Sequence, residues 1–315
     1  MMPRPRLRWI LFLLLISLAR LAGPSPALTQ EPQPGYKLRV DVNLVSVMTT
    51  VLDSSGQPAV GLNRDDFEIF EDGVRQELEV FEPQTHLPLV LALMVDASLS
   101  TAKDLHFEKE SAARFIGQAL AGQDRLAVYQ FSDEVRRLSD YSRDVDALQR
   151  AVREITPDAG TALYDAIVRG SRELARSQGR KVMILVTDGD DTTSENDFHA
   201  ALGAAQRAEA LLYAVVIRPI RSEAGRNVRG EHALTQLAEG TGGRVFFPDR
   251  VEELDQIFPA INQELRTQYL LGYYPKPNAS AGNFRRIEVH VKRPGLVVRH
   301  RAGYYAHPES DEGSP

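Results

Sequence analysis

The sequence predicts an α/β fold in which a doubly wound, mostly parallel sheet is inserted in or flanked by a small antiparallel β-sandwich. Three observations predict it. Short apolar runs end in acidic turn residues, stretches with strand character alternate with stretches of helical periodicity, and alternating strand patterns lie on both sides of this region. In an open sheet of this kind, ligands collect at the carboxyl ends of the strands.

The central region, expected over residues 87–266, alternates strands and helices. Leu87 to Val95 and Lys181 to Val186 are apolar runs typical of buried parallel strands. Ala102 to Leu120 places apolar residues at helical spacing, which indicates the crossover helix after the first strand. Further strands are expected over 124–131, 135–138, 211–217 and 244–247, and further helices over 144–155, 161–177, 198–210, 232–239 and 251–266. This alternation predicts a largely parallel sheet.

Two flanking segments, expected over residues 37–84 and 268–306, show the alternation of antiparallel strands. The expected strands are 38–52, 67–70, 77–81, 269–274, 285–292 and 296–300. Strands 67–70 and 77–81 should form a hairpin across the turn Glu71-Asp72-Gly73. The simplest arrangement is one sandwich built from both ends of the chain, and the alternative is two independent β appendages.

Residues 1–27 have the form of a cleavable export signal. Three arginines among the first eight residues give a basic start, Trp9 to Ala19 is apolar, and Ser25-Pro26-Ala27 offers small residues for cleavage. A membrane anchor is the alternative, but the apolar stretch is short for a bilayer span and Arg20 closes it. We therefore expect a secreted or periplasmic protein without a stable membrane span after cleavage.

Cleavage would leave residues 28–36 as a linker, and residues 307–315 are expected to be a disordered tail. Removing residues 1–27 takes away four arginines and no acids, so the formal charge falls from −6 to −10. An acidic balance with no basic tract argues against nucleic-acid binding. The chain has no cysteine, which excludes disulfides, thiolate metal ligands, a cysteine nucleophile and a lipid-modified cysteine at the signal junction.

Oxygen-bearing side chains stand where two of the central strands are expected to end. Asp96, Ser98 and Ser100 follow the first, Asp188 follows the second, and Thr161 is expected at the N-terminus of the helix over 161–177. Two carboxylates roughly cancel the charge of a dication, and the set suits a hard cation such as Mg²⁺, Mn²⁺ or Ca²⁺. Since five side chains need not fill six positions, the ion should attract a carboxylate from a partner. This favours recognition over catalysis.

At these residues the chain resembles the von Willebrand factor type A domain, whose metal-ion-dependent adhesion site combines Asp-x-Ser-x-Ser with a later Thr and a later Asp. This chain matches those positions, in the family's order, with Asp96, Ser98, Ser100, Thr161 and Asp188. The resemblance implies a Rossmann-like doubly wound sheet and a Mg²⁺, Mn²⁺ or Ca²⁺ ion completed by an exposed Asp or Glu of a protein ligand. A scaffold whose site holds no functional ion is the alternative.

The flanks add a narrower resemblance. The residues that carry it are Asn63 to Phe67 with Glu71-Asp72-Gly73, Leu271 to Pro275, and Gly303-Tyr304-Tyr305. They are similar to the von Willebrand factor A-related domain of Acidobacteria, and the likeness covers roughly residues 37–306. That subgroup implies export in a Gram-negative bacterium and supplies no firm partner or activity.

We therefore predict an exported, non-enzymatic module that binds another protein through a divalent cation. The alternatives are a structural cell-envelope component with a non-functional metal site and a metal-dependent hydrolase. Acids after strands also occur in phosphoryl-transfer enzymes, but Ser98 stands where enzymes of the haloacid dehalogenase type have a second Asp. Asp190, Asp191 and Glu195 are either extra ion ligands or part of a solvated acidic loop. The partner's identity and the oligomeric state do not follow from the sequence.

Overall fold

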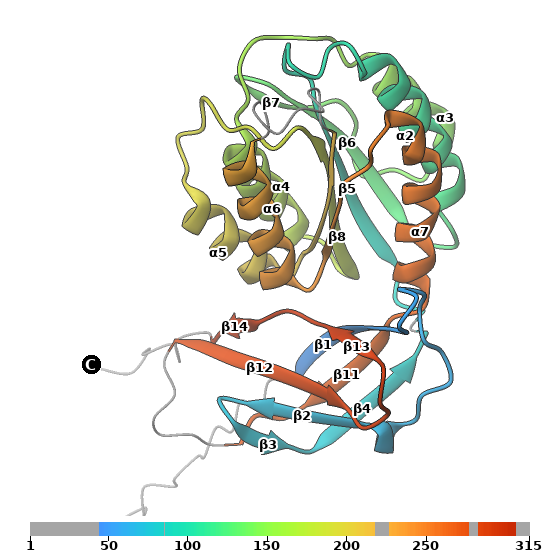
Figure 1. Cartoon of the computed structure of the whole chain (residues 1–315), viewed down its shortest axis with the longest axis vertical. Coiled ribbons are helices and arrows are strands. Elements are labelled where there is room, and N and C mark those ends of the chain that lie inside the picture. The colour runs from blue at the N-terminus through green and yellow to red at the C-terminus, as the bar shows by residue number, and fades with distance from the viewer. Residues whose placement is uncertain (1–43, 85, 218–226, 277–282, 307–315) are drawn as a thin grey trace, which may run out of the picture. The chain divides into compact units, whose positions relative to one another are not determined.

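The computed structural model describes residues 44–84, 86–217, 227–276 and 283–306. The predicted signal (1–27), linker (28–36) and tail (307–315) lie outside these residues, as do residues 38–43 of the first expected strand. The described helices and strands follow one another as the pattern predicts (Figure 1). No helix in the described ranges is both long and apolar enough to cross a bilayer.

A six-stranded sheet in the order β10-β9-β8-β5-β6-β7 forms the centre of the fold. Its strands are β5 (Leu89–Asp96), β6 (Arg125–Phe131), β7 (Val135–Arg137), β8 (Arg180–Thr187), β9 (Leu211–Val216) and β10 (Arg244–Phe246). All neighbours pair in parallel except β7, which runs antiparallel to β6 at one edge. Every residue of β5 is buried, because helices cover both faces of this sheet.

Helices α2, α3 and α7 cover one face of the sheet, and α4, α5 and α6 cover the other (Figure 1). Alternate residues of β5 serve the two cores, since Leu91 and Leu93 pack with the first group while Ala92 and Met94 pack with the second. The fold class is therefore confirmed. The helices are α2 (Leu105–Ala119), α3 (Val145–Arg153), α4 (Leu163–Ala175), α5 (Phe198–Ala208), α6 (Val228–Thr241) and α7 (Leu254–Arg266), with the short 3₁₀ turns η1 (Arg64–Asp66) and η3 (Val251–Glu253).

The flanking strands form two four-stranded antiparallel sheets, in the orders β13-β1-β11-β4 and β14-β12-β2-β3. Strands from opposite ends of the chain pair directly, because β1 pairs with β11 and β2 pairs with β12. A separate apolar core that includes Val47, Ile69 and Leu271 holds them together. The strands are β1 (Val45–Leu52), β2 (Phe67–Glu71), β3 (Val74–Gln76), β4 (Leu78–Pro83), β11 (Tyr269–Tyr273), β12 (Phe284–Val291), β13 (Val297–Arg299) and β14 (Gly303–Tyr305).

The expected hairpin between 67–70 and 77–81 is wrong. β2 turns back onto β3 through Asp72 and Gly73, both at positive φ, which is the turn that an Asp-Gly pair favours. The following residues enter the other sheet as β4 and pair with β11, where Phe81 stacks on Tyr269. The sequence pattern also does not predict β3, which has only three residues.

Candidate cation site

β5 and β8 lie side by side at the centre of the sheet, and the chain leaves both strands at the same edge. Their register pairs Val95 with Val186, which brings the next residues of the two strands together. Asp96 and Ser98 are buried, Asp188 is nearly so, and Ser100 is exposed. We call Asp96, Ser98, Ser100, Thr161 and Asp188 the cation-site rim.

Hydrogen bonds join four of the five rim residues. The Ser98 backbone N–H donates to Asp96 Oδ1 at 2.9 Å. The hydroxyl oxygens of Ser98 and Ser100 lie 2.9 Å apart, and the Ser100 hydroxyl donates to Asp188 Oδ2 at 2.5 Å. The structure therefore brings Asp96, Ser98, Ser100 and Asp188 to one place, with their side-chain oxygens close together.

Thr161 lies on a separate loop, and its printed contacts are to the loop that follows Asp188. The expected helix over 161–177 starts late, since α4 begins at Leu163 with Ala162 as its N-cap, so the prediction that Thr161 lies at the helix N-terminus is wrong by two residues. The Thr161 backbone N–H donates to Thr192 Oγ1 at 2.9 Å, and its carbonyl accepts the Thr192 N–H at 2.8 Å. These bonds fix Thr161 to the loop that follows Asp188. No hydrogen bond joins the Thr161 hydroxyl to the other rim residues within the described ranges.

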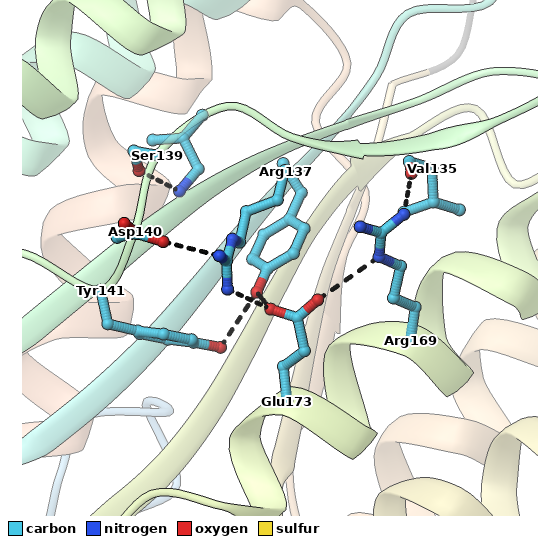
Figure 2. Close-up of polar contacts among 9 residues, drawn as sticks. Val135, Arg137, Ser139, Asp140, Tyr141, Arg169 and Glu173 are labelled. Atoms are coloured by element: carbon cyan, nitrogen blue, oxygen red, sulfur yellow. Dashed lines mark hydrogen bonds and ion pairs between the residues drawn. The ribbon is translucent and has the colours of Figure 1, made fainter.

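Helix α4 is fixed to the β6–β7 edge by an acidic side chain, Glu173 (Figure 2). Glu173 accepts hydrogen bonds from the Tyr129 hydroxyl at 2.7 Å and from Arg137 Nη1 at 2.8 Å, and Arg169 Nε lies 3.4 Å away. Burial alone would raise the pKa of Glu173, but the hydrogen bonds and these cations outweigh it and lower that pKa. We call these four residues the edge cluster. Its one carboxylate therefore has two cationic partners from the chain, and Arg137 also pairs with Asp140 at 2.6 Å.

The rim has no such compensation. Burial raises the pKa of Asp96 to about 6, and nearby Asp188 adds to the rise, although hydrogen bonds from Thr187 and Ser98 oppose it. Neither acid forms an ion pair with a basic side chain in the described part of the chain. Two neighbouring carboxylates beside hydroxyl oxygens, with no counter-charge, fit a hard divalent cation.

A cation here would depend on neutral oxygen donors. Over the described ranges, no group of three or more His, Cys, Asp and Glu side chains is placed to hold a metal ion. Two carboxylates would have to be supplemented by the hydroxyls of Ser98, Ser100 and Thr161 or by water. This donor set remains a prediction from the sequence, and Mg²⁺ commonly keeps several waters.

The other acids of the loop after Asp188 have partners of their own. The Asp190 carboxylate accepts from the Asn227 side chain. Asp191 accepts from the Tyr164 backbone N–H at 3.2 Å and from the Ser194 hydroxyl at 2.6 Å. These contacts order Asp190 and Asp191 in the loop, although Asp190 is exposed, and Glu195 is exposed as well.

Sequence reasoning missed two side chains near the rim. The Thr187 hydroxyl donates to Asp96 Oδ2 at 2.7 Å and so orients that carboxylate. Glu108 is buried on α2, in line with the buried residues Leu105 and Ala112. The signal for Glu108 was present, because an acid at helical spacing among apolar residues is unusual for a core-facing position.

The von Willebrand factor type A domain profile matches residues 91–260, a stretch that contains all five rim residues. Solved structures with a similar fold include an aerotolerance-related membrane protein from Bacteroides fragilis (19% identity, 56% of this chain and 98% of that chain, TM-score 0.45). They also include a von Willebrand factor type A protein from Catenulispora acidiphila (13%, 87% and 76%, TM-score 0.49) and the vWF domain of the type V pili tip protein Mfa5 from Porphyromonas gingivalis (15%, 56% and 96%, TM-score 0.44). At these identities the likeness concerns the fold alone. No match was found among curated proteins.

Proposed function

We propose that this chain, which belongs to the von Willebrand factor type A domain family, is an exported module that binds a partner protein through a divalent cation. Asp96 and Asp188 supply the negative charge, and Ser98, Ser100 and Thr161 supply neutral oxygens, directly or through water. Mg²⁺ is the expected ion, with Mn²⁺ or Ca²⁺ as substitutes. The observation that carries the proposal is the pair of buried acids that lack a counter-charge beside these hydroxyls.

Charge and exposure both support a carboxylate ligand from a partner. Two carboxylates only balance the two positive charges of a dication and do not surround it with excess negative charge. The ion can therefore still attract an additional Asp or Glu. Ser100 is exposed and Leu99 beside it is 67% exposed, so one side of the rim opens to solvent. An exposed Asp or Glu on a partner protein can approach from that side.

The hydrogen bonds of the acids in the loop after Asp188 favour a binding role over a hydrolytic one. Asp190 and Asp191 are the acids that follow Asp188, and each is engaged in hydrogen bonds that order the loop. A hydrolase would need a general base near the ion. We therefore propose no catalytic step. The proposal of export rests on the basic start and apolar stretch within residues 1–27, which lie outside the described residues.

Thermal unfolding with added cation tests the proposal. Wild-type protein should unfold at a higher temperature in Mg²⁺ or Mn²⁺ than in EDTA, since a ligand that binds only the folded state stabilises it. Asp96→Ala should lose this increase, whereas the control Asp146→Ala, which removes an exposed acid on α3, should keep it.

Affinity capture from an envelope extract then tests the partner. Immobilised wild-type protein should retain a partner in Mg²⁺ and release it in EDTA, and Asp96→Ala should not retain it. A wild-type protein that shows no cation-dependent shift and retains the same proteins in EDTA would identify a structural envelope component instead.

A further inference from the structure

A cavity of about 240 Å³ lies at the end of the central sheet opposite to the cation-site rim. Its lining includes Arg180 and Lys181 at the start of β8, Leu211 at the start of β9, and residues of β1 and β11. The rim begins where β8 ends, and this strand of eight residues rises by about 3.3 Å per residue. The cavity therefore lies roughly 25 Å from Asp188 and is separate from the proposed cation site.

The walls of this cavity are mainly apolar, and the cavity opens to solvent. Leu87 in its lining is 43% exposed and Glu209 is exposed as well, so a small molecule can enter there. An apolar cavity of about 150 Å³ binds benzene, so this cavity has room for roughly ten non-hydrogen atoms. The apolar side chains of the lining are Met48, Leu87, Ala205, Ala210, Leu211 and Leu270.

The charged side chains of the lining are mostly cationic. They are Arg180, Lys181 and Arg301 against a single acid, Glu209, so the formal charge of the lining is +2, whereas that of the whole chain is −6. Glu209 pairs with Arg301 at 2.6 Å, and the Nε of Arg301 is buried without an acceptor. Arg180 and Lys181 form no ion pair within the described ranges. The lining therefore holds cationic charge that the chain does not balance.

Arg180 is buried, and only part of its guanidinium is satisfied. Its Nε donates to the Leu87 carbonyl at 3.0 Å and its Nη1 to the Leu265 carbonyl at 2.5 Å, but its Nη2 donates to no group in the described part of the chain. The acid that acts on Arg180, Asp124, is already paired with Arg266 at 2.5 Å. Burial and Arg266 lower the pKa of Arg180 to about 10, so its guanidinium is still charged at neutral pH. A buried charge of this kind is unfavourable until an anion approaches it.

We propose that this cavity binds a small carboxylic acid with an apolar chain of about eight carbons. The carboxylate accepts from Arg180 Nη2 and lies near Lys181, a charge-assisted contact that supplies the missing counter-charge. The chain lies along the apolar walls and removes their surface from water. An inorganic anion leaves those walls uncovered, and a neutral apolar molecule leaves Arg180 unpaired. The inference goes beyond the proposed function, because it needs no cation at the rim.

Isothermal titration with octanoate in EDTA tests this proposal, because EDTA keeps the carboxylate from binding a cation at the rim. One octanoate should bind per chain. 1-Octanol has the chain without the charge and acetate has the charge without the chain, so each should bind at least roughly tenfold more weakly than octanoate. Octanoate that does not bind, or that binds no more tightly than 1-octanol or acetate, would overturn the proposal.

The substitution Arg180→Gln tests the placement of the carboxylate, with Arg125→Gln as the matched control. Arg125 also begins a strand of the central sheet, β6, but it is exposed and does not line the cavity. Arg180→Gln should bind octanoate roughly tenfold or more weakly than wild type, as expected for loss of a hydrogen bond between charged groups. Arg125→Gln should stay within about twofold of wild type.

A second variant covers the case in which Arg180→Gln folds poorly. Lys181→Gln removes the half-buried cation beside Arg180, and a loss of octanoate affinity of roughly threefold or more is expected. Wild-type affinity for octanoate in a folded Arg180→Gln, or in Lys181→Gln where Arg180→Gln does not fold, would show that the carboxylate does not lie at these cations.

Discussion

Asp96 is fully buried and Glu173 is half-buried in the α/β domain, and the groups around the two carboxylates differ in kind. Glu173 receives a tyrosine hydroxyl and two arginines from the edge cluster, and the result is a lowered pKa (Figure 2). Asp96 receives only the Thr187 hydroxyl and the Ser98 amide, and burial together with Asp188 leaves its pKa raised to about 6. Glu173 has its counter-charge supplied by the chain, whereas we propose that an ion supplies it at the rim.

The antiparallel sheets follow the pattern of the edge cluster. Glu71 accepts from two tyrosine hydroxyls, and Asp66 pairs with Arg293 at 2.7 Å. Compensated acids are therefore found in both parts of the described chain. Asp96 and Asp188 differ from these acids, because neither forms an ion pair with a basic side chain in the described part of the chain, and the following predictions test that contrast.

The pH dependence of the cation-free protein is the largest expected effect. The pKa of Asp96 is about 6 in the folded state against 3.8 for an ordinary Asp, so the folded state holds the proton more tightly. The stability that this proton confers is present below pH 3.8 and is lost as the pH rises to about 6, by about 3 kcal/mol in the free energy of unfolding. Urea unfolding in EDTA should show this decline in wild type and a flatter profile in Asp96→Asn. Parallel profiles would contradict the assignment.

Loss of the second rim acid should remove stabilisation by the cation. At a Mg²⁺ concentration of roughly a hundred times the Kd, the wild-type protein should gain about 2.7 kcal/mol in the free energy of unfolding. Asp188→Ala should gain no free energy of unfolding from Mg²⁺, because only one of the two rim carboxylates is left to balance the charge of the ion. Denaturant unfolding with and without Mg²⁺ measures both proteins. Asp146→Ala, an exposed substitution on α3, should keep the full gain.

A substitution in the edge cluster should lower the stability of the protein without changing its affinity for the cation. Glu173→Ala leaves the buried Tyr129 hydroxyl and two arginines without their acceptor, so the free energy of unfolding should fall by about 2 kcal/mol. Cation affinity should not change, and Glu173→Gln should have a smaller effect. Titration of the folded variant with Mg²⁺ checks the second point. A parallel fall in affinity would mean that the edge cluster and the rim are not independent.

The smallest effect is expected at His300 in the antiparallel sheets. Burial lowers the pKa of His300, and its Nε2 accepts the Val289 backbone N–H at 3.1 Å, a bond that protonation would break. The unfolded state then binds the proton more readily, so stability is lost as the pH falls below the ordinary His value of 6.5, by no more than about 1 kcal/mol. This dependence has the opposite sign to that of Asp96. His300→Gln should remove it in urea unfolding measured from neutral to acidic pH.

Local patterns predicted the fold where elements are long and strongly apolar or amphipathic. α2 falls within its expected range and β5 extends one residue past its own, because burial and helical periodicity act over many residues. The path from β3 to β4 was missed because three-residue strands carry little pattern, and the stacking of Phe81 on Tyr269 is a contact between distant parts of the chain. Tertiary packing decides such cases.

The rim could be predicted in part. Asp96 and Asp188 were expected to meet because parallel strands end at the same edge of a sheet, and the register of β5 and β8 brings them there. The contact of Thr187 with Asp96 depends on that register, which local patterns do not provide. Glu108 was overlooked although its spacing with Leu105 and Ala112 placed an acid on a buried helix face.

Titration with Mn²⁺, followed by the electron paramagnetic resonance signal of the free ion, tests the central claim most directly. The wild-type protein should withdraw a single Mn²⁺ per chain from solution, and Asp96→Ala should leave the signal of the free ion unchanged. A wild-type protein that leaves all Mn²⁺ free, or an Asp96→Ala variant that binds it as tightly as wild type, would contradict the account.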